Sequence, residues 1–285
     1  MRSFSMRAAG IWSLTWIACA LIFAGMLWVY FFYTATPAIA QQKFLEFLTG
    51  YLIEKSLSID NLFAFYMVFH YFRIPIDYQR RVLVYGIGCA VIMRLLLILL
   101  GVWLVSQFHW VLYLLGLFLL VSGVKMLFLA RREQDLKDSI ILQWLQKHLR
   151  LTKELHANKF FVRHGGLLYF TPLFLALILV EVSDLVFALD SIPAIFAVTQ
   201  DPLIVWTANI FAILGLRALY FLLAQMADRF ALLKYGVAFI IIFVGVKMLI
   251  EPWIVIPLLF SLGVVIGVLG LFILVNILLL RRVRG

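Results

Sequence analysis

Apolar stretches long enough to cross a lipid bilayer recur along this chain of 285 residues, and they constrain its fold more than any other feature. A helix needs about 20 apolar residues to span the hydrocarbon core. Hydrophobic residues make up 65% of the chain and charged residues only 13%, which is more apolar surface than a soluble domain of this length can bury. A membrane β-barrel would instead alternate apolar and polar residues in short segments. The sequence therefore predicts an all-α polytopic membrane protein.

Eight transmembrane helices are predicted, at residues 11–33, 43–72, 82–106, 110–130, 167–198, 203–224, 232–250 and 253–280. Lys and Arg gather in every second connection and at both ends of the chain. Because cytoplasmic loops carry the excess of Lys and Arg, we expect both termini in the cytoplasm. Membrane topology thus explains the net charge of +10, and we expect no nucleic-acid partner.

These spans divide the chain into five parts. The first span is expected to be retained, because its apolar core of about 22 residues exceeds that of a secretory signal. The parts are an N-terminal helix (1–42), a three-helix unit (43–130), a basic cytoplasmic loop (131–166), a second three-helix unit (167–250) and a C-terminal helix with a basic tail (251–285). Apolar residues among the charges of the loop predict a short amphipathic surface helix around Leu142, Trp144, Leu145 and Leu149.

The two three-helix units resemble each other. Three features recur in the same order at nearly one spacing, namely Glu54-x-Ser56 with Glu181-x-Ser183, Arg94 with Arg217, and the pentapeptide GVKML at 123–127 and 245–249. The predicted topology makes the second unit enter the membrane from the opposite side. Such inverted repeats place a shared site near the middle of the bilayer. Lys125 and Lys247 lie near span ends, where we expect them to extend to the interface.

Five carboxylates lie inside apolar spans: Glu54, Asp60, Glu181, Asp184 and Asp190. A carboxylate at the bilayer centre costs about 2.5–3.5 kcal/mol even on lenient scales, so each requires a partner. A cation is one partner that several clustered carboxylates can share. Neutral oxygens from Ser56, Asn61, Ser183 and Ser191 would complete the coordination. An all-oxygen ligand set favours Mg²⁺, Ca²⁺ or Mn²⁺ over Cu⁺ and Zn²⁺.

Helical geometry leaves the arrangement of these acids open. At about 100° per residue, Glu54, Ser58 and Asn61 share one face of a helix, whereas Glu181 and Asp190 point in opposite directions. Either the helices are broken locally or the acids form more than one site. Pro193 favours a break, because its ring displaces a helical carbonyl.

Three interpretations of the buried acids compete. They could bind a metal ion, they could form a purely structural network with Arg94 and Arg217, or they could relay protons without a metal. Two arginines cannot neutralise five acids, which favours the cation. The two cysteines, Cys19 and Cys89, are far apart and belong to no thiol metal motif.

Several stretches resemble the TerC family of bacterial inner-membrane proteins, most closely its Alx-type members. The matching stretches are Thr49–Asn61, Arg80–Gly86, Glu181–Asp184, Phe187–Val198 and Asn209–Arg217. The resemblance implies export of manganese from the cytoplasm and a place among cation exporters with inverted three-helix repeats. It also implies an inner-membrane location. Alx-type members usually carry a further acidic N-terminal span, and we expect this chain to begin after it.

The resulting hypothesis is a divalent-cation exporter, with Mn²⁺ as the transported ion and Arg94 and Arg217 as charge-pairing or gating residues. Proton exchange at the carboxylates would couple transport to the proton gradient. The alternative is a metal-binding membrane scaffold that does not transport, and that supplies metal to exported enzymes or acts in tellurite, pH or redox stress. No HExxH or GxSxG pattern is present, so we expect neither an enzyme nor an organic cofactor. The expected partners are a divalent metal ion and the bilayer. The sequence also allows association with further copies of the same chain as a homo-oligomer.

Overall fold

The structure of the chain is a computed structural model that describes residues 6–129, 140–152, 154–156, 158–164, 166–216, 219–220 and 233–284. The predicted residue Arg217 lies outside the described residues, and so does the side chain of Asp60.

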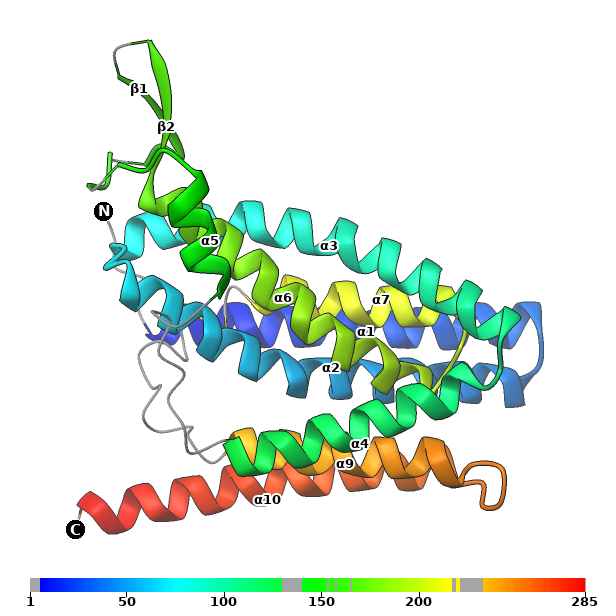
Figure 1. The fold of residues 1–285 in the computed structure, drawn as a ribbon. Coiled ribbons are helices and arrows are strands. Elements are labelled where there is room, and N and C mark those ends of the chain that lie inside the picture. Colours follow the sequence, from blue (N-terminus) through cyan, green and yellow to red (C-terminus); the bar gives the residue numbers. More distant parts are fainter. Residues whose placement is uncertain are drawn as a thin grey trace.

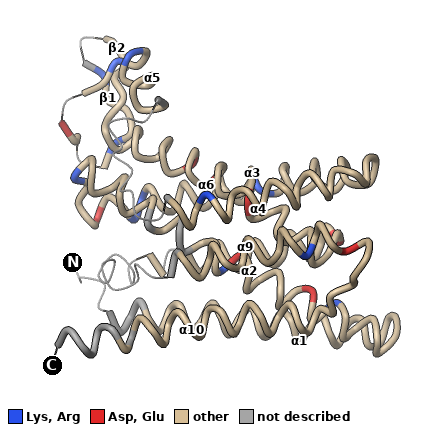
Figure 2. Tube along the Cα trace, turned by 60° about the horizontal axis from the view of Figure 1, so that its bottom comes forward, with Lys and Arg blue, Asp and Glu red and all other residues tan. Residues whose placement is uncertain are grey.

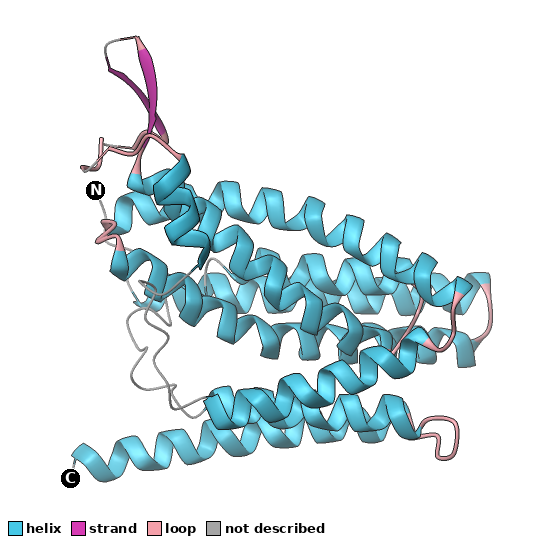
Figure 3. Cartoon of the chain, viewed as in Figure 1, coloured by secondary structure: helices cyan, strands magenta, loops and turns pink. Residues whose placement is uncertain are grey.

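Helices dominate the described chain (Figures 1 and 3). They are α1 (Met6–Thr34), α2 (Pro37–Tyr71), α3 (Ile76–Gln107), α4 (Val111–Leu129), α5 (Ile140–His148), α6 (Pro172–Phe196), α7 (Pro202–Leu214), α9 (Leu233–Ile250) and α10 (Leu258–Arg284). Strands β1 (Phe161–His164) and β2 (Leu167–Phe170) form an antiparallel hairpin that pairs Phe161 with Phe170.

Five helices of the described chain are long and apolar enough to cross a membrane, namely α1, α3, α4, α6 and α10. Helix α2 is longer, at 35 residues, but its sequence contains five charged residues, Lys43, Glu46, Glu54, Lys55 and Asp60. Helices α7 and α9 are apolar but shorter. The protein is thus an all-α membrane protein, as predicted, whereas eight spans and inverted repeats stay predictions.

The starts of several helices follow from local sequence. Pro37, Pro172 and Pro202 each open a helix, where the missing N–H of proline costs no hydrogen bond. Thr36 and Asp201 precede two of these prolines, and their side chains accept hydrogen bonds from the backbone amides of Ile39 and Leu203.

Helix ends differ from the predicted ones by several residues at a number of places, and two predicted spans begin before the helix does. The fifth span was expected to begin at 167, but Leu167–Phe170 is strand β2, because Gly166, with φ of 80°, turns the chain back onto β1. The last span was expected from 253, but α10 begins at Leu258, after Pro257. A proline disfavours helical backbone at the residue before it, which delays the helix.

The amphipathic surface helix predicted in the basic loop is confirmed as α5. Its Leu142 and Leu145 are buried, whereas Trp144 is exposed. These two leucines belong to an apolar cluster with residues of α6, so the helix packs its apolar face on the protein itself.

Helix α2 is central, because it contacts α1, α6, α7, α9 and α10. Glu54 is the midpoint of this helix, 17 residues from Pro37 and 17 from Tyr71. Figure 1 places the start of α1, the α2–α3 turn and the end of α10 at one end of the bundle, and Lys and Arg positions are frequent along the trace at that end in Figure 2. This arrangement agrees with the predicted alternation of basic loops.

Helices α4 and α9 pack backbone to backbone at the glycines of the repeated GVKML pentapeptides. A Cβ atom on Gly245 would lie 2.7 Å from the Leu120 amide nitrogen and 2.9 Å from the Gly116 carbonyl oxygen. A Cβ atom on Gly123 would lie 2.7 Å from the Ile242 side chain. Small residues allow such close approach between membrane helices, so the repeated motif has a packing role.

Gly245→Val should destabilise the protein by about 1–3 kcal/mol, because the added side chain overpacks the α4–α9 contact. The measurement is the thermal unfolding midpoint of the purified chain in detergent. Gly263→Val on α10 is the matched control, since a Cβ atom there meets nothing within 4 Å. Equal midpoints for the two variants would contradict the close contact.

Candidate functional site

Arg94 is the centre of a buried polar network at the middle of the bundle. Its Nε and Nη2 atoms donate to the two carboxylate oxygens of Asp184, at 3.1 and 2.8 Å. Its Nη1 atom donates to Glu54 and, at 2.7 Å, to the amide oxygen of Asn209. Asn61 donates to Asp184 at 3.0 Å. Four helices, α2, α3, α6 and α7, therefore meet through one guanidinium.

These side chains have almost no access to solvent: Arg94 and Glu54 are each 1% exposed, and Asp184 is 3% exposed. The paired geometry with Asp184 is the bidentate form that arginine makes with carboxylates. One guanidinium faces two carboxylates, so the network carries a net charge of −1 when both acids are ionised. That residual charge requires a further cation or a proton, because an uncompensated buried charge is strongly unfavourable.

Three buried oxygens on the same face of α2 accept no hydrogen bond from the described residues. They are Glu54 Oε2, Ser58 Oγ and Asn61 Oδ1. Their spacing places them on the face predicted from helical periodicity, and Glu54 and Asn61 contact the Arg94 network. The oxygens are therefore available to a ligand that carries positive charge or donates hydrogen bonds.

Glu181 lies apart from this network. Both of its carboxylate oxygens are buried, and neither is paired with a described residue. Oε1 packs on α3, where a Cβ atom on Gly86 would come within 2.9 Å of it. Glu181 and Asp184 both line a small cavity of about 20 Å³ between α2, α3, α6 and α7. That volume is sufficient for about one water molecule.

Asp190 points elsewhere, as the geometric reasoning allowed. Its carboxylate accepts a hydrogen bond of 2.9 Å from Ser122 on α4. Helices α2 and α6 are both continuous, so the local break that Pro193 favoured is not found, and the other alternative, more than one site, applies. The proline lies in the last turn of α6, where the loss of one backbone hydrogen bond is tolerated. The acids consequently occupy more than one place, and Asp190 does not join the Arg94 network.

The predicted serines have different surroundings. Ser56 and Ser183, which correspond in the two halves, donate to the carbonyl oxygens of Leu52 and Leu179 in their own helices, at 2.6 and 2.8 Å. Ser191 is buried, and its hydroxyl has no hydrogen-bond partner among the described residues. Within the described chain, no three His, Cys, Asp or Glu side chains form a group that could hold a metal ion. A metal ion in this conformation would thus also need neutral oxygens.

Asn209 and Lys55 were missed by sequence reasoning. Asn209 is a polar residue in an apolar span, and that signal could have identified it. Lys55 Nζ lies 3.4 Å from the carbonyl oxygen of Ala212, beside Gly215, where α7 ends. A positive charge at the carboxyl end of a helix is favourable.

A second polar cluster, also missed, lies where α2 begins and α7 begins. Lys43 Nζ lies 3.1 Å from Glu46 and 2.8 Å from Asp201. The buried carboxylate of Glu46 also accepts a hydrogen bond of 2.8 Å from Thr199. These contacts join α2 to the α6–α7 connection at the end remote from the basic loops.

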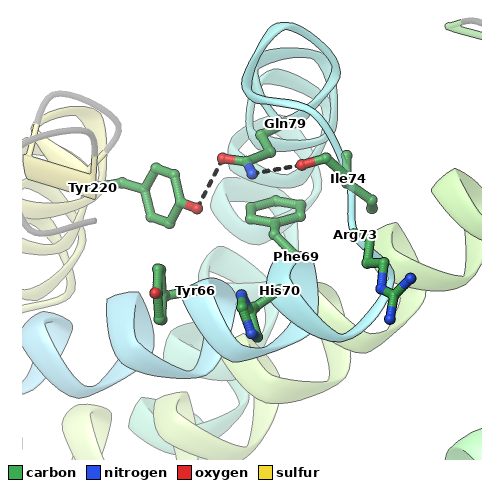
Figure 4. A pocket seen from close by; sticks show the side chains of 7 residues that line it. All are labelled: Tyr66, Phe69, His70, Arg73, Ile74, Gln79 and Tyr220. Carbon is green, nitrogen blue, oxygen red and sulfur yellow. Dashed lines mark hydrogen bonds between the residues drawn. The ribbon is translucent and has the colours of Figure 1, made fainter. Parts of the chain in front are cut away.

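A cavity of about 280 Å³, lined by both polar and apolar side chains, lies at the opposite end of α2 (Figure 4). Gln79 bridges two of its walls, because it donates to the Ile74 carbonyl oxygen at 2.8 Å and accepts from the Tyr220 hydroxyl at 2.9 Å. His70 and Arg73 also line it. The Arg94 network thus lies between two polar ends of the same helix.

The fold and this network define a class: a polytopic helical membrane protein with a charged, solvent-excluded centre. The pattern of the integral membrane protein TerC family matches residues 39–284. The chain belongs to the TerC family.

Curated relatives are similar over nearly the whole chain. The proteins from Escherichia coli K12 and Photorhabdus laumondii, both named "Putative membrane-bound redox modulator Alx", are 53% and 51% identical. The alignments cover 96% and 97% of this chain, and 85% and 86% of the relatives. An uncharacterized membrane protein from Rickettsia felis is 42% identical over 93% of this chain and 85% of its own length. No solved structure matches the chain.

Arg94→Gln should destabilise the protein by about 3–5 kcal/mol, because it leaves two carboxylates buried without their cation. Adding Asp184→Asn should recover part of that loss, since one of the stranded charges is removed. Thermal midpoints measured in detergent with a chelator present would reveal the recovery. A double variant no more stable than Arg94→Gln would contradict the proposed charge balance.

Proposed function

We propose that the chain exports divalent cations, Mn²⁺ in particular, across the bacterial inner membrane through the Arg94 network. The observation that carries the proposal is the imbalance of charge at the centre of α2. Glu54 and Asp184 share one guanidinium, and three oxygens beside it accept no hydrogen bond from the described residues. A divalent ion would compensate the negative charge that the guanidinium leaves unpaired in this buried centre.

The potential ligand atoms at the centre are all oxygens, which supports binding of a hard divalent ion. The donors around the centre are carboxylate, amide and hydroxyl oxygens, which suit Mg²⁺, Ca²⁺ and Mn²⁺. Manganese is selected among these by the resemblance to the TerC exporters. Glu54, Asp184 and Asn61 would provide the first ligands, and Glu181 would supply further charge along the path. Ser56, Ser183, Ser191 and Asp190 are less directly placed and belong to the proposal only as further oxygens on α2 and α6. Asp60 belongs to it on the sequence alone.

Arg94 would act as a tethered substitute for the ion. While the guanidinium holds Glu54 and Asp184, the two carboxylates remain ligated without metal. An entering ion competes with the guanidinium for the same oxygens, and Arg94 must then move or share them. A competitor built into the site keeps the empty carrier stable and makes ion release easier. Protonation of a carboxylate would have the same effect, which couples export to protons.

The path would run along α2. The cavity with His70 and Gln79 lies at the end predicted to be cytoplasmic, and the Lys43–Glu46–Asp201 cluster closes the other end. In an alternating-access cycle, the ion enters at one end and leaves at the other after the helices rearrange around the central site. Separation of the Lys43 ion pairs would accompany the outward opening.

The names of the relatives suggest a second role, in redox control. In this chain, Cys19 and Cys89 are free thiols on different helices, α1 and α3. Their placement gives no support to dithiol chemistry. A scaffold that binds metal without transport remains the competing function, and it differs from export in one measurable property, the flux of ions.

Glu54→Gln and Asp184→Asn should each reduce manganese efflux by about tenfold or more, since each change removes a charge that the ion must replace. Retained manganese is measured in cells loaded with Mn²⁺ and then transferred to metal-free medium. Glu154→Gln, the same chemical change at an exposed residue outside the bundle, is the control. Unchanged efflux by a correctly inserted Glu54→Gln protein would defeat the proposal.

Proteoliposomes that contain only this chain separate export from a scaffold. Export predicts movement of Mn²⁺ into a lumen that holds a metal-sensitive dye, and the movement should be lost in the Glu54→Gln variant. A scaffold predicts saturable binding of Mn²⁺ by the protein with no signal from the lumen.

A further inference from the structure

The hairpin formed by β1 and β2 stands out to one side of the helix bundle. Figures 1 and 3 show it directed across the helix axes, at the end that holds the α2–α3 turn. Helices that cross a bilayer lie along its normal. A segment that projects sideways from their ends therefore lies along the membrane surface, beyond the edge of the bundle.

Contacts at its base fix the direction of the hairpin. The Thr171 hydroxyl donates to the Lys159 carbonyl oxygen at 2.7 Å, and the Phe170 amide donates to the Arg150 carbonyl oxygen at 2.8 Å. The rings of Phe161 and Phe170 pack on Phe174 of α6, with centroids 4.9 Å apart in both pairs. The hairpin is thus attached to the first turn of a membrane helix.

Arg81 of α3 ties the connection before β1 to the bundle. It donates to the Asn158 carbonyl oxygen and lies over the rings of Tyr85 and Phe160. The hairpin is therefore anchored to the bundle where β1 begins and where β2 ends.

Apolar side chains remain uncovered on the projecting part. Phe161, Leu167 and Leu168 are each almost half exposed on a strand pair of only eight residues. The pairing of Phe161 with Phe170 and of Arg163 with Leu168 places Phe161 and Leu168 on one face of the hairpin and Leu167 on the other. An isolated two-stranded hairpin is marginally stable in water. A surface that receives these side chains would stabilise the hairpin.

The charge around the hairpin identifies that surface. Residues 140–171 contain five Lys or Arg and a single acidic residue, Glu154. Lys159 and Arg163 are exposed on the hairpin and its approach. Basic residues beside exposed apolar ones match the headgroup layer of a membrane that contains anionic lipids.

We propose that the hairpin is a lipid-docking element that lies on the anionic leaflet at the basic end of the bundle. Leu168 enters the headgroup layer, and Arg163, its cross-strand partner on the same face, binds lipid phosphates together with Lys159. Because α6 follows the hairpin directly and carries Glu181 and Asp184, docking fixes the depth of these acids relative to the bilayer. The proposal does not depend on which ion the protein binds.

A spin label at Leu168 tests the docking. The label is attached to Leu168→Cys in the full chain with Cys19 and Cys89 replaced by Ala, and the protein is studied in detergent, in neutral nanodiscs and in nanodiscs containing phosphatidylglycerol. Collision with a water-soluble nickel chelate measures exposure. We expect the label to be protected from the chelate in anionic nanodiscs and exposed in detergent.

Charge reversal provides the second measurement. Lys159→Glu with Arg163→Glu should shift the equilibrium toward the undocked hairpin by about tenfold in anionic nanodiscs, whereas Lys159→Arg with Arg163→Lys should retain protection. Equal exposure in detergent and anionic nanodiscs would overturn the proposal. Protection that needs added cytosolic protein would also overturn it, because the partner would then be a protein. So would protection that the charge reversal leaves intact.

Discussion

The interaction on which the structure depends is the contact of one arginine with two carboxylates in a place that water does not reach. Arg94 joins Glu54 of α2 to Asp184 of α6 and reaches Asn209 of α7. Without this cation, two acids would face each other in an apolar bundle. With it, one negative charge still remains. The centre is therefore largely, but not fully, compensated in charge by the residues around it.

The rest of the fold supports that centre. The α4–α9 pair is locked by glycines, and α2 contacts five other helices, so its midpoint is held firmly. The polar groups at the two ends of α2 are of different kinds, an ion-paired cluster at one end and an open cavity at the other. A carrier that is closed at one end and accessible at the other would have this form.

Much of this could be predicted from the sequence, because membrane helices have strong signals. The apolar runs gave the fold class, and helical periodicity correctly placed Glu54, Ser58 and Asn61 on one buried face. An ion pair between Arg94 and Glu54 was part of one interpretation of the sequence, and the structure contains it. The pairing of Arg94 with Asp184 could not be predicted, since it depends on how α3 packs against α6. Short apolar segments are ambiguous because their structure also depends on tertiary contacts. From sequence alone, Leu167–Phe170 is compatible with the first turn of the following helix, whereas in the structure it pairs with β1 as a strand. Asp190 and Glu181 show that acids of one motif, a few residues apart, can face different neighbours along a continuous helix.

Anomalous diffraction at the manganese edge, from crystals of the chain grown with Mn²⁺, tests the central claim most directly. An ion bound by Glu54 and Asp184, with the Arg94 guanidinium displaced from at least one of them, is the predicted result. If manganese instead sits only at the ends of the bundle while Arg94 still bridges both carboxylates, the central network is a structural ion pair and the ion takes no path through it.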